Sequence, residues 1–550
     1  MGFLEHRLIL LRRGYAPSAD LGACAHRQLQ TAAEAFTYQW IVDRQPELLD
    51  ATMDALASLR GQQGADGLFT TGDNLASPPD TSFSINGLCR LLRVLEDRPD
   101  ADMAPVRDAA SEIVRNATRA LISGGVHTPN HRWEISCALV QVWHLFGDPA
   151  CLDRAHEWLA EGIDLQPDGL FSERSPNYAV HVTGPCLLDM SFLLELPDLA
   201  EAVHTHLHAI VPLVDERDEV DTTASRRQDQ RSAFPLAHYA LLYRRLAVAR
   251  GCDTCAAMAN RAERGVVIPD VDAVAQCLLD PRLDDDLAPA HSVPATPPGW
   301  QLLATSRLAV WRRDAHRLVA HAASDVGELG RLSSGIGADP TFLTVDAPGL
   351  RLGLRLSRDF FNLGPFRAER LRVERGDVIL DEQVEAYYYQ PLPPRFRRPD
   401  GDYELEFEGR FAAQMAFSHR ERTSVPLGTT VRITPAAAGV QLRIDSEGAS
   451  APHVLEIALR GRPAPGATSG AIELLDERTS VARGDGELAD GRLHVHLDGQ
   501  FDTTGPVPEY NPGETYRFLG GTDAVRDARV LLAFRGPGTR RISLTARGPA

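Results

Sequence analysis

The sequence predicts a multidomain protein of the α-then-β class, in which an N-terminal (α/α) toroid precedes a large antiparallel β-sandwich domain. A chain of 550 residues exceeds what one ordinary core can organise. Apolar residues recur at helical spacing in the first half and at alternate positions in the second half. An acidic and then Pro-rich segment separates the two patterns, so we expect domains over residues 1–285 and 300–550 with a linker over 286–299.

The first half contains one amphipathic segment after another, such as "PELLDATMDALASLR" and "VRDAASEIVRNATRALI". Two of the loops between such segments share the tetrapeptide Asp-Gly-Leu-Phe, which begins at Asp66 and again at Asp168. The 102 positions between them match two helical hairpins of about fifty residues each. Repeated hairpins that close on themselves bring equivalent loops to one end of a ring. We therefore predict a closed toroid, with an open helical array or bundle as the alternative.

From about residue 300 the pattern changes to that of strands. Segments such as "LRLGLRLS", "VQLRIDS" and "GRLHVHLDG" alternate or run apolar over strand lengths, with Gly, Pro and Asp turns between them. This is typical of a large antiparallel β domain.

The composition excludes several functions. A formal net charge of -18 argues against nucleic acid or an anionic membrane surface as the general partner. All 57 basic residues are Arg, which excludes a Schiff-base lysine, a P-loop lysine and a kinase strand lysine. The N-terminal segment carries no long apolar run before a small-residue cleavage site, and we find no apolar run of membrane-spanning length. We therefore expect a cytoplasmic protein, and we leave a homo-oligomer open.

The 8 Cys residues all lie within the first 277 positions, which is not the pattern of a disulfide scaffold. Cys252 and Cys255 form a single C-x-x-C with no second pair beside it in the sequence. We predict free thiols there, with a zinc or redox site as the alternative. No cofactor is expected, and a divalent metal in the β domain is the alternative.

Two polar stretches in the helical half are candidates for a site. "TPNHRWEIS" brings Asn130, His131 and Trp133 to the start of a predicted helix, where Asn130 is also a plausible N-cap. "DGLFSERSPNY", residues 168–178, places Glu173, Arg174 and Tyr178 in a loop between two helices. The alternative interpretations are an ordinary helix cap and a polar loop closed by a Glu-Arg ion pair.

The spacing of these stretches connects them. Tyr178 follows His131 by 47 positions, about one helical hairpin, so their loops are expected to be neighbours at one end of the ring. A phenol, an imidazole and a carboxamide around one cavity suit proton abstraction next to a carboxylate. The amide and Arg groups would stabilise the enolate, and the phenol would protonate the departing oxygen.

Two further groups are candidate substrate contacts. "ASRRQDQRSAF" is the densest basic cluster of the helical half and predicts a carboxylate-binding site, with a solvated helix face as the alternative. Its candidate residues are Arg226, Arg227, Gln228 and Arg231. In "SPPDTSF", Asp80 is an N-cap or a ligand of sugar hydroxyls.

The β half contributes weaker signals. In "HRLVAHAASD", a carboxylate at Asp325 follows His321 by four positions and could orient its imidazole or join it in a metal site, and His316 lies nearby. An ordinary edge-strand histidine is the alternative. The tyrosines of "EAYYYQPLP", Tyr387 to Tyr389, could stack on sugars, although strand alternation predicts that at least one of them faces the core.

The order Asp-Gly, then Glu-Arg-Ser-Pro, then Tyr at residues 168–178 resembles the helical-domain motif of heparinase II/III-type polysaccharide lyases. The upstream Asn130-His131 pair is similar to that group's Asn/His position, and a helical toroid followed by a β-sandwich is its domain order. In motif the resemblance covers about 50 residues of the helical half.

The resemblance implies β-elimination from a uronic-acid-containing glycan. It implies Tyr178 as acid and base, Asn130 as the group that neutralises the uronate carboxylate, and His131 as an assisting base or carboxylate contact. The family also draws a histidine from its β domain, often in a His-x-His-x-x-Asp setting. This sequence departs from that pattern, because only His321 precedes Asp325.

The leading hypothesis is therefore a lyase acting on an acidic oligosaccharide or polysaccharide. The alternative is a glycoside hydrolase on the same scaffold, using Asp80 and Glu173 as its paired carboxylates. A catalytically silent glycan-binding or scaffold protein is the third hypothesis, and it predicts indifference to loss of the Tyr178 hydroxyl.

Overall fold

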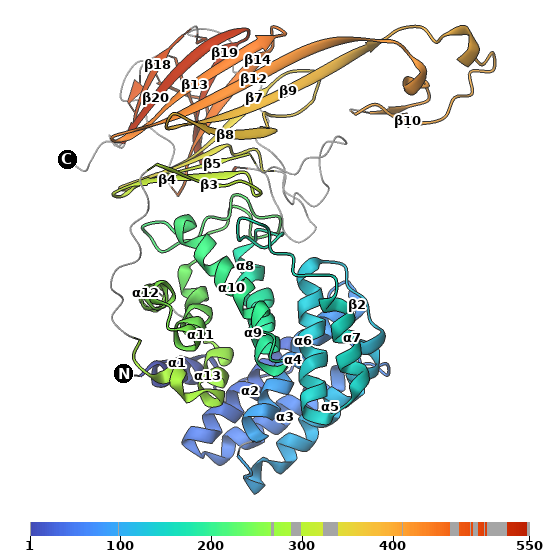
Figure 1. Cartoon of the computed structure of the whole chain (residues 1–550), viewed down its shortest axis with the longest axis vertical. Coiled ribbons are helices and arrows are strands. Elements are labelled where there is room, and N and C mark those ends of the chain that lie inside the picture. Colours follow the sequence, from blue (N-terminus) through green and yellow to red (C-terminus); the bar gives the residue numbers. More distant parts are fainter. Residues whose placement is uncertain are drawn as a thin grey trace. The chain divides into compact units, whose positions relative to one another are not determined.

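The computed structural model describes two compact units of the chain. The described residues are 2–96, 98–265, 269–287, 299–322, 339–409, 411–461, 472–483, 486–487, 493–499, 501–502 and 525–546. The helical unit comprises Met1–Val214, Asp218–Val220 and Phe234–Ala295, and the β unit comprises Asp215–Arg217, Asp221–Ala233 and Thr296–Ala550. Most of the predicted linker, residues 288–298, lies outside the described residues. The predicted order of helices first and antiparallel strands second is confirmed (Figure 1).

The helical unit is built from consecutive helical hairpins. Helix α2 packs on α3, α4 on α5, α6 on α7, α9 on α10 and α11 on α12. The helices are α1 (Phe3–Gly14), α2 (His26–Asp43), α3 (Pro46–Gln62), α4 (Pro78–Glu96), α5 (Ala104–Ser123), α6 (Pro129–Phe146), α7 (Pro149–Leu159), α8 (Pro176–Tyr178), α9 (Gly184–Leu193), α10 (Pro197–Ile210), α11 (Ala240–Arg250), α12 (Asp253–Ala262) and α13 (Val271–Leu279). A short hairpin of β1 (Phe69–Thr71) and β2 (Asn74–Ser77) precedes α4.

Local sequence explains why these helices form where they do. Helix α5 buries one stripe of apolar residues at three- and four-residue spacing, which are Val106, Ala110, Ile113, Val114, Ala117 and Leu121. Helix α6 has proline at its first position, where the missing N–H would have no partner in any case. It ends at Gly147, whose φ of 74° favours glycine.

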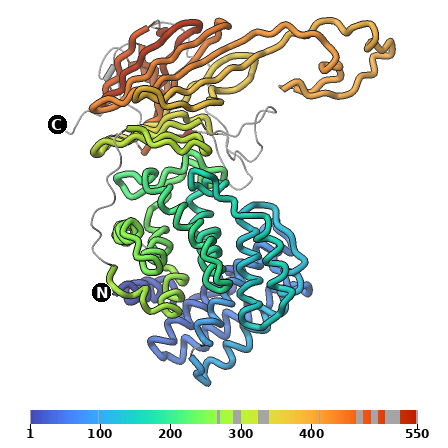
Figure 2. The backbone as a smooth tube through the Cα atoms, in the orientation of Figure 1, coloured from blue at the N-terminus to red at the C-terminus, as the bar shows by residue number. Residues whose placement is uncertain are grey.

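The helices also pack on one another across the hairpins. Helix α4 contacts α2 and α6, and α6 contacts α9. The last helix, α13, returns to contact α1, α2 and α4, so the end of the unit meets its beginning. Figure 2 shows the green end of the unit beside the blue N-terminal helices.

The repeated Asp-Gly-Leu-Phe loops are equivalent corners of the helical unit. Gly67 and Gly169 have φ values of 85° and 87°, a conformation that glycine adopts at little cost. Each corner has the same pair of backbone hydrogen bonds, Gly67 N to Gly64 O and Gly64 N to Leu68 O in the first, and Gly169 N to Gln166 O and Gln166 N to Leu170 O in the second. The following phenylalanines, Phe69 and Phe171, are both buried against a histidine ring. The repeat is therefore structural.

The β unit holds two large sheets. The nine-stranded sheet has the order β15-β16-β19-β14-β7-β6-β5-β4-β3, and the seven-stranded sheet has the order β17-β18-β20-β13-β12-β9-β8. Within the described strands the pairing is antiparallel except between β16 and β19. The strands are β3 (Trp300–Leu303), β4 (Leu308–Arg313), β5 (His316–His321), β6 (Leu343–Ala347), β7 (Leu350–Arg358), β8 (Arg370–Glu374), β9 (Asp377–Tyr389), β10 (Glu406–Phe407), β11 (Ala412–Ala413), β12 (Arg422–Ala436), β13 (Gly439–Gly448), β14 (Pro452–Leu459), β15 (Ile472–Leu474), β16 (Thr479–Ala482), β17 (Gly486–Glu487), β18 (Leu493–Asp498), β19 (Ala528–Arg535) and β20 (Gly538–Ala546).

One apolar core joins the two sheets. It includes Leu352, Leu354 and Leu356 of the larger sheet and Val431 and Ile433 of the smaller one. Strand β7 is buried along its whole length, and Arg351 and Arg355 lie at positions that alternate with its leucines. Because successive side chains point to opposite faces, β7 presents leucines to the core and arginines to the other face of its sheet.

Strands β9 and β12 form a long hairpin that runs past the rest of its sheet (Figure 1). Tyr387 and Tyr389 are half-buried and Tyr388 is exposed. The prediction that one of these tyrosines faces the core is wrong, because this part of β9 extends beyond the sheet. Tyr389 instead packs on Phe417, with 4.8 Å between ring centroids.

Across the described ranges, no helix combines the length and the apolar character that crossing a membrane would require.

Candidate functional site

The two polar stretches of the helical half meet through one buried hydrogen bond. The Nδ2 atom of Asn130 donates to the Oε2 atom of Glu173 over 2.7 Å. Both side chains are buried, and Asn130 has no exposed surface. The expectation that the loops around His131 and Tyr178 are neighbours is therefore supported by direct contact between their segments.

The helix cap differs from the prediction. Thr128 is the N-cap of α6, and Pro129 occupies the first helical position, so Asn130 lies inside the first turn. The prediction of Asn130 as the N-cap is wrong, because proline is best accommodated at the first helical position and shifts the cap to Thr128. The Asn130 amide is thereby directed into the protein, towards Glu173.

Tyr178 ends a short helical turn that the loop sequence explains. Pro176 opens α8, and the Oγ atom of Ser175 accepts a hydrogen bond from the Tyr178 backbone N–H at 3.2 Å. The chain then continues into η2 (Ala179–Thr183), a π-helical turn that contacts α6. Such turns occur frequently at functional sites. Tyr178 is half-buried.

Arg174 adopts a strained backbone conformation in the same loop. Its φ is 50°, which is uncommon for a residue with a side chain, and the side chain is buried. Strain of this kind persists only where the surrounding structure holds it, and it concentrates at functional sites. The loop from Glu173 to Tyr178 is therefore a well-specified structure.

His131 lies in an aromatic cluster beside the loop. Its ring stands edge-on to His127 at 4.7 Å and to Phe83 at 6.4 Å between centroids. The Arg27 guanidinium stacks on the Phe83 ring of this cluster, 3.7 Å from the ring centre. These contacts connect the first turn of α6 to α2 and α4.

Asp80 anchors the start of α4. Its carboxylate accepts hydrogen bonds from the Oγ atom of Ser77 at 2.7 Å and from the Nδ2 atom of Asn74 at 3.1 Å, and it also pairs with Arg27. The N-cap alternative is close to what is observed, because Asp80 lies in the first turn of α4 and its backbone N–H donates to Ser77.

Trp133 belongs to the core of the helical unit. Its side chain is fully buried, and its Nε1–H donates to the Oδ1 atom of Asp164 at 2.8 Å. Although Trp133 follows His131 by two positions, the helical turn directs it to another side of α6.

A cavity of about 360 Å³, lined by charged and apolar side chains, lies within the helical unit, and no sequence motif predicts it. Its lining comes from α2, α4, α6, η2, α9, α11 and α13, and Phe83, which contacts His131, is part of it. The cavity also reaches Val180 and His181, directly after Tyr178. It therefore adjoins the candidate site.

Paired buried charges line this cavity. The Arg90 guanidinium lies 3.3 Å from Glu34 and 2.6 Å from Asp272, and that of Arg245 lies 2.7 Å from Asp189. Burial raises the pKa of Glu34 to about 7. Burial opposes the charged form of Asp189 as well, but Arg245 leads a group of arginines that keeps the pKa of Asp189 below its ordinary value.

Glu134 is the cavity carboxyl closest in sequence to the candidate site. It accepts a hydrogen bond from the Nδ2 atom of Asn86 at 2.8 Å, and burial raises its pKa to about 7. Burial also lowers the pKa of His181 to about 4, so this imidazole is neutral at pH 7. A carboxyl group with a pKa near 7 can take up or release a proton near neutral pH.

The predicted basic cluster belongs to the β unit. Residues Asp221–Ala233 group with the strands, and they form turns and not the helix that the alternative interpretation assumed. The Nη1 atom of Arg231 donates to Thr341 at 2.6 Å and pairs with Asp339 at 3.2 Å. Arg227 is buried, whereas Arg226 and Gln228 are half-buried. The pairing of Arg231 with Asp339 explains why this segment leaves the helical unit.

His321 ends strand β5 and is buried in the β unit. Its Nδ1–H donates to the carbonyl oxygen of Thr341 at 3.0 Å, which leaves the Nε2 atom as the basic nitrogen of the ring. The predicted carboxylate partner, Asp325, lies outside the described residues. His316 begins the same strand and is half-buried.

Comparison with solved structures identifies the fold. The heparan sulfate lyase HepC from Pedobacter heparinus aligns with 100% of this chain and 83% of its own, with a TM-score of 0.51 and 11% identity. A heparinase III aligns with 100% of this chain and 84% of its own, with a TM-score of 0.55 and 10% identity. No family model matches the sequence, and no curated protein matches it. The chain therefore has the fold of heparinase III-type polysaccharide lyases at a low level of sequence identity.

Proposed function

We propose that this protein is a lyase that cleaves a uronic-acid-containing oligosaccharide or polysaccharide by β-elimination. The observation that carries the proposal is the buried contact between Asn130 and Glu173, which joins the Asn-His turn to the Tyr178 loop. The fold shared with two polysaccharide lyases supports the same reaction class. The proposed substrate is acidic, and its carboxylate needs local neutralisation on a chain of net charge -18.

In the proposed mechanism, Asn130 binds the uronate carboxylate and Glu173 orients it. An ionised carboxylate only accepts hydrogen bonds, so Glu173 fixes the NH2 side of the Asn130 amide towards itself. One N–H of that amide is engaged by Glu173, and the second is assigned to the substrate carboxylate. Withdrawal of charge from that carboxylate acidifies the proton at the neighbouring carbon.

Tyr178 is the proposed proton-transfer residue. As a phenolate it takes the proton from the carbon next to the carboxylate and becomes a phenol. The phenol gives that proton to the departing glycosidic oxygen while the C–O bond breaks and the C=C bond forms, which balances the elimination. His131 assists as a base or as a second carboxylate contact. Arg174 is proposed as a substrate contact beside them.

The β unit is proposed to contribute Arg226, Arg227, Gln228 and Arg231 to substrate binding and His321 to catalysis. The Nδ1–H of His321 donates to a backbone carbonyl, so the Nε2 atom carries the lone pair and is suited to act as a base. We also propose that the helical unit is a closed α/α toroid. The return of α13 to α2 and α4 around the cavity supports this.

The hydrolase alternative requires Asp80 and Glu173 to act as paired carboxylates. Asp80 is instead fully engaged by Ser77, Asn74 and Arg27, and it holds the start of α4. No observation in the described chain favours hydrolysis over elimination.

The test is a panel of glucuronate-, iduronate- and mannuronate-containing glycans, followed by ultraviolet absorbance and mass spectrometry. A lyase yields products with a double bond conjugated to the carboxylate and no added water. Products that gain one water per cleavage and show no such absorbance would overturn the proposal.

A further inference from the structure

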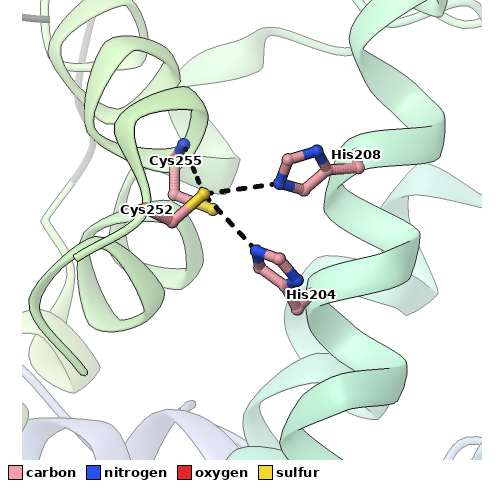
Figure 3. A group of neighbouring side chains, drawn as sticks. All are labelled: His204, His208, Cys252 and Cys255. Carbon is pink, nitrogen blue, oxygen red and sulfur yellow. Dashed lines mark hydrogen bonds between the residues drawn. The ribbon is translucent and has the colours of Figure 1, made fainter. Parts of the chain in front are cut away.

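A second cluster of reactive side chains lies in the helical unit, outside the proposed catalytic group. It consists of His204 and His208 on α10 together with Cys252 and Cys255 at the start of α12 (Figure 3). One nitrogen from each histidine and the two sulfur atoms all lie within 4.8 Å of one another. The Sγ atom of Cys252 is 3.4 Å from the Nε2 atom of each histidine.

Local structure explains why these four side chains converge. His204 and His208 are four positions apart on one helix, so they share a face, and their ring centroids are 4.4 Å apart. Cys252 is the N-cap of α12, where its sulfur accepts the backbone N–H of Cys255 at 3.4 Å. The C-x-x-C spacing therefore turns both thiols towards α10, as Figure 3 shows.

The distances suit a tetrahedral metal. Zinc binds cysteine sulfur at about 2.3 Å and histidine nitrogen at about 2.0–2.1 Å, which separates S and N ligands by roughly 3.5 Å in a tetrahedron. The observed 3.4 Å between the Cys252 sulfur and each histidine nitrogen already matches this separation. The other ligand atoms lie within 4.8 Å of one another, so they need to move by about 1 Å or less to close the shell. A Cys2His2 set is also among the sets that select zinc over harder cations.

The surroundings of the cluster support ligation. Glu201 lies 3.8 Å from the Nδ1 atom of His204, on the side of the ring away from Cys252, and it also pairs with Arg250. A carboxylate behind a ligating histidine orients the ring and strengthens it as a ligand.

We propose that His204, His208, Cys252 and Cys255 bind one zinc ion in a structural site. Four protein ligands fill a tetrahedral shell, so the ion has no open position for a substrate. The site joins α10 to α12, two helices that belong to different hairpins. It makes the C-x-x-C a metal site and not a redox pair.

Through helix α10, the zinc site also stabilises the loop that carries Glu173 and Tyr178. Between the two ligand histidines, His206 faces another side of α10, where its Nδ1–H donates to the Gly169 carbonyl at 3.2 Å and its ring packs on Phe171. Gly169 and Phe171 belong to the loop that leads to Glu173 and Tyr178. Fixing α10 therefore fixes the corner from which that loop begins.

The first experiment measures metal content. The full-length protein is purified under reducing conditions without chelator, and metals are quantified by mass spectrometry. We expect about one zinc ion per chain, falling below about a tenth of an ion in Cys252→Ser and in His208→Ala. Cys24→Ser is the matched control, because Cys24 is a half-exposed thiol outside the cluster, and it should keep its zinc.

Cobalt substitution tests the ligand set directly and does not depend on variants that fold. Co²⁺ added to the reduced, zinc-depleted wild-type chain should give thiolate-to-cobalt charge-transfer bands and the intense visible bands of a tetrahedral ion, and zinc should displace them. A wild-type chain that holds no zinc and gives no such bands would overturn the proposal. Equal loss of zinc in Cys24→Ser and Cys252→Ser would also overturn it. A cobalt spectrum without thiolate bands would do the same.

Discussion

The amide of Asn130 donates to the carboxylate of Glu173 over 2.7 Å, and neither group is exposed to bulk solvent. Glu173→Gln should therefore keep the fold but release the orientation of the amide, since a glutamine can present either an oxygen or an N–H to Asn130. A hydrogen bond to a charged group contributes about 1.5–3 kcal/mol, so we expect kcat/KM to fall roughly 10- to 150-fold.

The matched control for that variant is Glu161→Gln, which removes an exposed carboxylate paired with Arg132. It should leave the rate of formation of unsaturated product unchanged. Complete loss of activity in Glu173→Gln, with hydrolysis products in the wild type, would favour the paired-carboxylate hydrolase instead.

Tyr178→Phe should abolish elimination while leaving substrate binding nearly intact. The change removes only the phenol oxygen, and loss of a general acid-base group costs about 10²- to 10⁴-fold in rate. The rate is followed by ultraviolet absorbance, and binding by calorimetry with the inactive variant. The control is Tyr387→Phe, because Tyr387 lies on strand β9, where its hydroxyl donates a hydrogen bond to Glu385. This variant should retain full activity. A fully active Tyr178→Phe protein would contradict the proposed role.

Arg90→Leu should destabilise the helical unit strongly. The substitution leaves the buried carboxyl group of Glu34 and the partly exposed carboxylate of Asp272 without their cation, and breaking a buried pair from one side costs about 3–5 kcal/mol. Thermal and urea unfolding, followed by circular dichroism at helical wavelengths, measure the change. Arg60→Leu breaks the exposed pair with Glu112 and should cost less than about 1 kcal/mol.

The stability of the helical unit should fall as pH rises from about 4.5 to about 7. Burial raises the pKa of Glu134 from its ordinary 4.5 to about 7, so in this window the folded protein binds a proton that the unfolded chain has released. The free energy of unfolding is therefore greatest at pH values below 4.5, the ordinary pKa of the carboxyl group. It declines as the pH rises through the pKa of about 7 in the folded protein. Glu34 has the same shift and adds to the decline.

Glu134→Gln isolates one part of this pH dependence, because a neutral amide needs no proton and retains an acceptor for Asn86. The slope of unfolding free energy against pH should become shallower between about 4.5 and 7. Glu112→Gln, at an exposed position, should leave the slope as it is. An unchanged slope in Glu134→Gln would show that its carboxyl is not protonated in the fold.

Gly67→Ala should be more harmful than Gly72→Ala. Both glycines have positive φ, 85° and 59°, but a Cβ at Gly67 would lie 2.0 Å from the Asn116 carbonyl oxygen, whereas none of the described atoms lies within 4 Å of one at Gly72. We expect a loss of about 1–2 kcal/mol for Gly72→Ala from backbone strain alone and of about 2–5 kcal/mol for Gly67→Ala. Unfolding curves of the two variants, measured side by side, separate the clash from the strain.

The order of the two halves is predictable from the sequence alone, because each segment has its own hydrophobic periodicity. The sequence also identifies the Asp-Gly-Leu-Phe repeat, since a corner with positive φ demands glycine wherever it recurs. The proximity of Asn130 to the Glu173 loop was predictable from hairpin length, although the N-cap was placed two residues too late.

The contacts between polar groups that are distant in the sequence depend on how the whole chain packs. The pairing of Arg90 with Asp272 joins residues 182 positions apart, and that of Arg231 with Asp339 carries a segment of the first half into the β unit. The four residues of the proposed zinc site show the same limit, because the histidines precede the cysteines by more than 40 positions and no short pattern contains both. Periodicity reports which face of a segment is buried, but the partner on the other side of that face depends on how the whole chain packs.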